Sequence, residues 1–189
     1  MRKIFKYLVL SALAITLFSC DSKNDNPTPP SDSSNLWGTT YYHANLGAYP
    51  DIYSKYWVYA YDITKNPNVG LRITGIYPKA RFFSFSIYND LKGEVIDGLD
   101  DVNLTPDEGY INPYLTTTDS SNNRFTIYLL KEGTDLALFA DAKAENVCYF
   151  NSSVECVSIC LRQYLGEGEF GGVELPKIDV DALRKKIIA

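Results

Sequence analysis

Short segments in which apolar and polar residues alternate are the feature that most restricts the fold of this chain. They recur from residue 57 to residue 164, and turn-forming residues such as Pro78 and Gly93 separate them. Because side chains two positions apart share one face of a β-strand, each segment predicts a strand with one buried face. The predicted strands cover residues 57–63, 70–77, 81–89, 94–97, 124–131, 147–150 and 154–164.

These strands indicate one all-β domain, which fits the length of 189 residues. Phe83, Phe85 and Ile87, for example, share one face of the segment 81–89. Many short strands joined by turns predict an antiparallel β-sandwich or a jelly-roll-like domain. Helical patterns occur only at residues 134–145 and 179–188, so we expect one or two short helices.

The first residues have the pattern of an export signal. Residues 1–6 include Arg2, Lys3 and Lys6, and residues 7–18 are apolar and uncharged. This apolar run is shorter than the roughly 20 residues that a helix needs to cross a bilayer. It therefore predicts a signal peptide instead of a permanent membrane span.

A cysteine directly follows this apolar run. The stretch Leu17-Phe18-Ser19-Cys20 resembles the lipobox of bacterial lipoproteins. The resemblance implies cleavage before Cys20, a diacylglycerol thioether on its sulfur, and an acyl chain such as palmitate on the new N-terminus. The alternative is an ordinary secretory signal that a cysteine follows by chance.

Residues 21–35 contain no apolar side chain other than prolines, so we expect them to be disordered. The predicted organisation is a lipoprotein signal peptide over residues 1–19, a lipid-anchored tether over 20–35 and a β-sandwich-like domain over 36–189. Asp21 leaves the choice of membrane open, because an acidic residue after the lipidated cysteine accompanies different destinations in different bacteria. We expect a protein of the bacterial cell envelope, and favour the outer membrane over the inner one.

Charge restricts the partners. The net charge is -5, and removal of residues 1–19 would take away three cations and no acid. Nucleic-acid binding needs clustered Lys or Arg to meet phosphates, so we exclude it as a function. The expected partners are the membrane, through the lipid anchor, and a protein or a glycan of unknown identity.

Three separated pieces of the chain carry a family resemblance. They are YPKARFFSFSIY (77–88), LTPD with INPY (104–107 and 111–114), and LRQY with GGVELP (161–164 and 171–176). In this order they resemble motifs of uncharacterised bacterial secreted proteins and lipoproteins, over residues 56–177. The resemblance implies a β-rich domain of unknown function and transfers no catalytic residue.

The chain has four cysteines, of which lipidation would use one. If residues 147–150 and 154–164 form a hairpin, Cys148 lies opposite Cys156 at a distance close to disulfide reach. We therefore consider a Cys148–Cys156 disulfide, which an oxidising compartment outside the cytoplasm permits. The alternative is that both are small buried apolar side chains.

Acidic residues gather in the segment 97–108. Asp97, Asp100, Asp101 and Asp107 are the only candidates for a Ca²⁺ site, because Ca²⁺ takes several carboxylate and carbonyl oxygens. Their spacing is not that of an EF-hand, and solvated turns are the simpler interpretation. The same carboxylates would supply the acid and base of a hydrolase. We assign no catalytic residue, no metal and no cofactor.

Two arginines and several aromatic residues are candidates for ligand binding. Arg81 and Arg162 belong to strands dense in aromatics, where a guanidinium pairs with a carboxylate or an aromatic ring, or anchors a ligand anion. Among the 15 tyrosines and two tryptophans, Tyr41, Tyr42 and Trp57 are the candidates for exposed rings that stack on a sugar or a partner. The alternative, which we favour, is that these aromatic side chains pack at strand edges and between the sheets.

Three functions follow from these features. The first is a lipid-anchored, non-enzymatic binding or structural module of the cell envelope. The second is a carbohydrate or small-ligand binder that uses exposed aromatics. The third is a hydrolase with an Asp/Glu pair. A pocket lined by aromatics without paired carboxylates favours binding, and two carboxylates facing across a cleft favour the enzyme.

Overall fold

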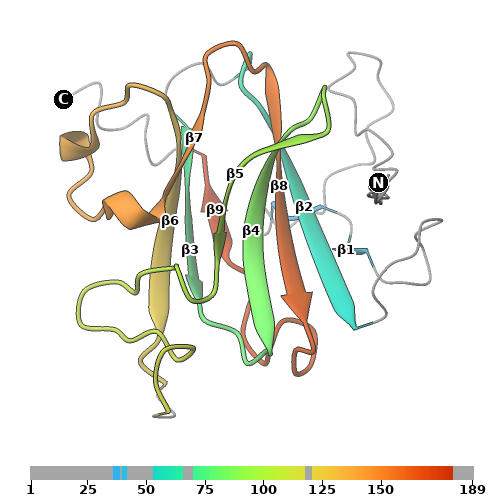
Figure 1. The fold of residues 1–189 in the computed structure, drawn as a ribbon, viewed down its shortest axis with the longest axis vertical. Helices are drawn as coiled ribbons and strands as arrows, with labels where there is room; N and C mark the ends of the chain where they lie inside the picture. The colour runs from blue at the N-terminus through green and yellow to red at the C-terminus, as the bar shows by residue number, and fades with distance from the viewer. Residues whose placement is uncertain (1–35, 39, 42–52, 66–69, 118–120, 181–189) are drawn as a thin grey trace, which may run out of the picture.

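Two β-sheets pack face to face, as Figure 1 shows for this computed structural model. The structure describes residues 36–38, 40–41, 53–65, 70–117 and 121–180. One sheet has the order β1-β2-β8-β4-β5 and the other has the order β7-β6-β3-β9. The strands are β1 (Thr40–Tyr41), β2 (Ser54–Asp62), β3 (Gly70–Ile76), β4 (Phe82–Asn89), β5 (Glu94–Asp100), β6 (Arg124–Lys131), β7 (Val147–Phe150), β8 (Cys156–Tyr164) and β9 (Lys177–Asp179). The all-β, sandwich-like architecture is confirmed.

The first sheet is built around β8. This strand pairs antiparallel with β2 on one side, from Ser54↔Tyr164 to Asp62↔Cys156, and with β4 on the other. β4 and β5 form an antiparallel hairpin, and a bulge between Ile87 and Tyr88 interrupts its register. β8 therefore contributes side chains to the centre of the inner face.

The second sheet contains a parallel pair, which the antiparallel prediction missed. β7 pairs parallel with β6, and the chain between them crosses over in residues 132–146. The helix predicted at 134–145 is wrong, because this crossover contains only two short 3₁₀ turns, η2 (Leu136–Leu138) and η3 (Ala144–Asn146). Its Phe139 ring lies 5.3 Å from the Tyr128 ring on the outer face of β6, so packing on the sheet takes precedence over helix formation.

The second predicted helix, at 179–188, begins inside β9. Asp179 is the last residue of that strand and pairs with Arg72 of β3. The sequence from 181 onward lies outside the described residues.

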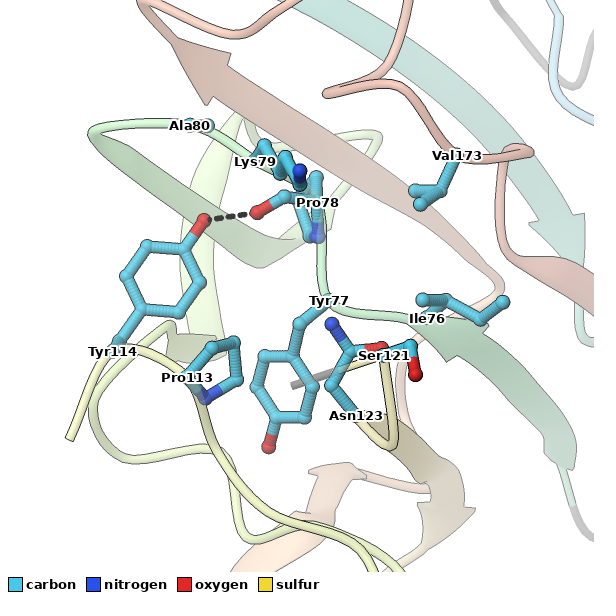
Figure 2. A pocket seen from close by; sticks show the side chains of 10 residues that line it. All are labelled: Ile76, Tyr77, Pro78, Lys79, Ala80, Pro113, Tyr114, Ser121, Asn123 and Val173. Carbon is cyan, nitrogen blue, oxygen red and sulfur yellow. Dashed lines mark hydrogen bonds between the residues drawn. The ribbon is translucent and has the colours of Figure 1, made fainter. Parts of the chain in front are cut away.

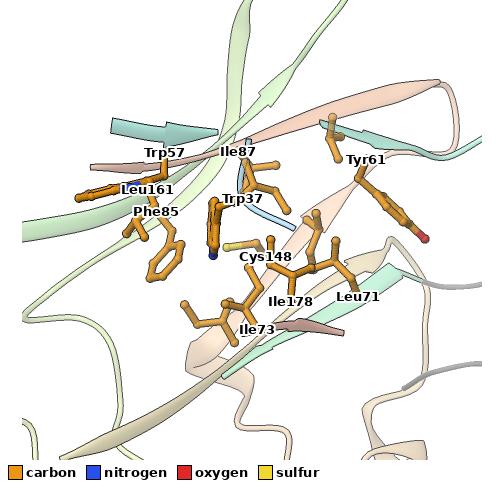
Figure 3. Close-up of a cluster of buried hydrophobic side chains, with 14 of the residues drawn as sticks. Trp37, Trp57, Tyr61, Leu71, Ile73, Phe85, Ile87, Cys148, Leu161 and Ile178 are labelled. Carbon is orange, nitrogen blue, oxygen red and sulfur yellow. The ribbon is translucent and has the colours of Figure 1, made fainter. Parts of the chain in front are cut away.

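The core lies between the two sheets and follows the predicted alternation (Figure 3). Phe83, Phe85 and Ile87 of β4 are each at most 1% exposed. The opposite sheet contributes residues such as Ile73 and Leu129. Apolar burial of this extent is the main favourable term in folding.

The segment before β1 closes one side of this core. Trp37 lies inside the cluster, and its indole N–H donates to the carbonyl of Pro176 at 2.6 Å. Residues 36–38 are therefore held against the segment that precedes β9, at the other end of the chain.

One buried asparagine joins the 101–123 connection to the second sheet. The Asn146 side chain accepts from the N–H of Thr105 at 2.8 Å and donates to the carbonyls of Thr105 and Thr126 at 2.6 and 2.9 Å. Its exposure is 0%, so these bonds are shielded from water.

Replacement of this residue, Asn146→Ala, is expected to lower the free energy of unfolding by about 3 kcal/mol, since it removes three hydrogen bonds of a buried side chain, each worth roughly 1 kcal/mol. Urea unfolding monitored by circular dichroism measures this loss. The exposed Asn103→Ala serves as the control and should change stability by less than about 1 kcal/mol. Equal losses in the two variants would contradict the role assigned to Asn146.

Candidate functional site

An open pocket of about 620 Å³ lies where three connections meet at one end of the sandwich. These are the β3–β4 turn, the β5–β6 connection and the segment that follows β8, and the first and last of them lie at the lower end of Figure 1. The apolar lining includes Ile76, Pro78, Pro113, Tyr114 and Val173, and the polar lining consists of Lys79, Ser121 and Asn123.

Two tyrosines fix the pocket wall. Tyr77 is fully buried, its ring lies 5.2 Å from the Phe125 ring, and its hydroxyl donates to the carbonyl of Leu104 at 2.6 Å. The hydroxyl of Tyr114 donates to the carbonyl of Pro78 at 2.7 Å, as Figure 2 shows. Burial raises the pKa of both phenols well above the ordinary value. Both therefore stay protonated at neutral pH and serve as structural donors.

The segment after β8 is pinned to the opposite side of the β3–β4 turn. The N–H of Lys79 donates to the carbonyl of Gly171 at 2.9 Å, and the N–H of Glu167 donates to the carbonyl of Lys79 at 3.0 Å. Gly171 has a φ of 57°, and a Cβ there would lie 2.5 Å from both the Lys79 nitrogen and Pro78 Cβ. Only glycine fits this close approach.

The polar groups of the pocket are few. Asn123 Oδ1 is buried and has no hydrogen-bond partner within the described part of the chain. The Lys79 side chain is exposed, and no ion pair of its ammonium occurs among the described residues. No Asp or Glu occurs among the described residues that line the pocket. The site therefore offers an apolar surface, one cation, and the polar side chains of Ser121 and Asn123.

The predicted aromatic site does not form around Trp57. This side chain is fully buried, and its ring packs edge-on against Phe170 at 5.3 Å. Trp57 is therefore not an exposed ring, and the alternative of packing between the sheets is correct for this residue, because it belongs to the inward face of β2. Tyr41 lies in β1 opposite Tyr56, whereas the Tyr41 side chain and the whole of Tyr42 lie outside the described part of the chain.

The two candidate arginines lie apart from the pocket lining. Arg162 lies on the outer face of the first sheet, 5.8 Å from the Tyr56 ring and 5.9 Å from the Phe82 ring. Its Nε and Nη2 donate to Ser54 Oγ at 3.3 and 3.1 Å. Arg81 is exposed, and its backbone N–H donates to the carbonyl of Tyr164.

The four acidic candidates are used separately. Asp97 accepts from the N–H of Tyr149 at 2.8 Å, and Asp100 accepts from the N–H of Asn103 at 3.0 Å. Within the described residues, no group of three metal-binding side chains is formed.

The other two carboxylates also have local roles. Asp107 pairs with Arg124 at 3.2 Å. Asp101 accepts from the N–H of Phe83 at 3.4 Å, and burial raises the pKa of its carboxyl. All four side chains thus stabilise turns or join neighbouring segments.

The proposed Cys148–Cys156 disulfide is not formed. Cys148 is a free thiol in β7, and Cys160 is also free. The predicted hairpin fails because β7 belongs to the sheet opposite β8.

Burial makes both free thiols unreactive. It raises the pKa of Cys148 to about 12 and that of Cys160 to about 11. We expect native protein at pH 8 to react with Ellman's reagent far more slowly than unfolded protein, because the thiolate is the nucleophile. Cys148→Ala and Cys160→Ala, measured singly, assign each phase. Rapid reaction of both thiols in the folded protein would contradict this burial.

The same pKa shifts predict a loss of stability at alkaline pH. An unfolded cysteine ionises near pH 8.5, before its folded counterpart. The contribution of these thiols to the unfolding free energy is therefore constant below about pH 8.5 and falls as the pH rises toward the folded values. Urea unfolding from pH 7 to pH 10.5 measures this slope, which Cys148→Ala should reduce. An unchanged slope in that variant would exclude Cys148 as a contributor.

Comparison with known proteins gives limited similarity. No protein-family profile and no curated protein matches the chain. The VPA0106 protein from Vibrio parahaemolyticus aligns with 72% of this chain and 33% of its own length, at 13% identity and a TM-score of 0.45. A putative uncharacterised protein from Burkholderia cenocepacia aligns with 69% of this chain and 30% of its own length, at 15% identity and a TM-score of 0.41.

The matched part of this chain thus spans about a third of each of these bacterial proteins. Fold and site together define an all-β, sandwich-like domain with an open pocket at one end. The resemblance to envelope proteins of unknown function stays a prediction.

The pocket itself was missed at the level of sequence, although a signal for it exists. Its lining residues belong to the three motif pieces at 77–88, 111–114 and 171–176, together with Ile76, Ser121 and Asn123. Sequence alone did not show that these pieces meet in space.

Proposed function

We propose that this protein is a lipid-anchored, non-enzymatic module of the cell envelope that binds a small ligand in the pocket beside Tyr114. The observation that carries this proposal is the composition of the lining, which is apolar and aromatic and includes no carboxylate among its described residues. Small-ligand sites typically combine apolar walls with a few polar groups, in volumes of roughly 300–1,000 Å³.

The polar groups of the pocket support binding over catalysis. Both tyrosine hydroxyls already donate to backbone carbonyls. Lys79 and Ser121 lie on opposite sides of the pocket in Figure 2, so they are not arranged as a base and its nucleophile. What the pocket presents is a surface for contact with a bound molecule.

The lipid anchor rests on the first 35 residues, which lie outside the described part of the chain. Within the described residues, no helix is long and apolar enough to cross a membrane. Diacylglycerol on Cys20 together with an N-terminal acyl chain would give the more than one chain that stable anchoring requires. A thioether on the Cys20 sulfur excludes a disulfide at the same atom. The acylated and the disulfide-bonded forms of the chain therefore have different masses.

Intact mass spectrometry of protein purified from native membranes tests the anchor. We expect a chain that begins at Cys20 and carries the mass of its acyl groups. Cys20→Ala should abolish cleavage and acylation, whereas Cys160→Ala, as the matched control, should retain both. An unacylated mass, or a disulfide from Cys20 to another cysteine, would rule out the lipoprotein assignment.

A further inference from the structure

We infer that the ligand of this pocket is a small amphipathic anion that has an apolar body, an anionic group for Lys79 and a hydrogen-bond donor for Asn123. This inference rests on the proposed function, because it assumes that the pocket is a binding site. It goes further by naming the chemistry of the ligand.

The apolar body follows from the walls. Ile76, Pro113 and Val173 surround the opening with aliphatic surface, and Ile76 remains 46% exposed. The Tyr114 ring closes one side, and its hydroxyl is already held by Pro78. A ligand that covers these side chains removes apolar surface from water, which is the main source of affinity in such sites.

The anionic group follows from Lys79. Two backbone hydrogen bonds, to Gly171 and from Glu167, fix the position from which this side chain extends. The chain as a whole carries a net charge of -5, yet the charge contributed by the described lining is positive. An anion at this place meets a cation that has no carboxylate partner among the described residues.

The donor follows from Asn123. Its backbone carbonyl accepts from the N–H of Tyr77 at 2.9 Å, so the residue is held in place. Its side-chain oxygen Oδ1 is buried and has no donor among the residues that the structure describes. A buried acceptor without a donor is unfavourable, and a ligand O–H or N–H relieves that cost.

The two polar groups are separated by the apolar lining. Figure 2 shows Lys79 on one side of the pocket and Asn123 on the other, with Pro78 between them and the Tyr77 ring beside Asn123. The ligand therefore carries its charge at one end and its donor at the other. This arrangement differs from a neutral sugar, whose hydroxyls are distributed over the whole ring.

Three probes separate these contributions: 8-hydroxyoctanoate has the charge and the donor, octanoate lacks the donor, and 1,8-octanediol lacks the charge. Binding is measured by equilibrium dialysis with the membrane-purified protein in phosphatidylcholine nanodiscs, with empty nanodiscs as the blank. Should the protein prove unacylated, the same dialysis is performed in buffer, so the result does not depend on the anchor.

We expect 8-hydroxyoctanoate to bind about three- to tenfold more tightly than either of the other probes. A single polar contact to a partly exposed group changes the dissociation constant by about this factor. Lys79→Gln should weaken the binding of 8-hydroxyoctanoate by the same factor and leave the binding of 1,8-octanediol unchanged. Asn123→Ala should weaken the binding of 8-hydroxyoctanoate and leave the binding of octanoate unchanged. Lys177→Gln on β9 and Asn103→Ala are exposed controls that should retain wild-type binding.

Circular dichroism and urea unfolding establish that each variant is folded. If all three probes bind equally and neither variant discriminates among them, the pocket remains a binding site but the anionic ligand is wrong. If a neutral sugar binds and 8-hydroxyoctanoate does not, the inference is likewise overturned. If no probe and no sugar binds at millimolar concentration, the inference and the binding function fail together, while the mass measurement still decides the anchor.

Discussion

The antiparallel pairing of β8 with strands on both of its sides is the constraint on which the rest of the structure depends. It fixes the register of β2 and β4 at once, and with it the inward direction of Trp57, Phe83 and Phe85. A slip of one residue would turn every one of these side chains toward solvent. The opposite sheet then has a defined apolar surface on which to pack.

The pocket is a consequence of how the end of this sandwich closes. Three connections meet there, and each is held by bonds to a backbone carbonyl or N–H: Tyr77 to Leu104, Tyr114 to Pro78, and Lys79 to Gly171. Because the polar ends of the tyrosines are used for this closure, their rings and the neighbouring prolines remain to form an apolar wall. The site therefore has few polar groups, and each one restricts the ligand.

Much of the fold was readable from local pattern, and the arrangement of its parts was not. The alternation around Phe83 and Phe85 gave the strands and the buried face correctly. It could not show that Cys148 belongs to the opposite sheet, because the partner of an edge strand is decided by packing across many residues. The position of Trp57 was left open for a related reason: aromatic content alone does not distinguish a core residue from an exposed one. Similarly, Pro113 and Val173 meet only in three dimensions.

The hydrogen bond from Trp37 to Pro176 spans 139 residues of sequence. The core is therefore incomplete until nearly the whole domain has been synthesised and is free to pair. Contacts between residues so far apart in sequence slow folding, because the entropic cost of closing the loop comes before the packing that offsets it. Among the described strands β9 comes last in the sequence, so the Pro176 carbonyl just before it becomes available to Trp37 only after the other strands of both sheets have been made.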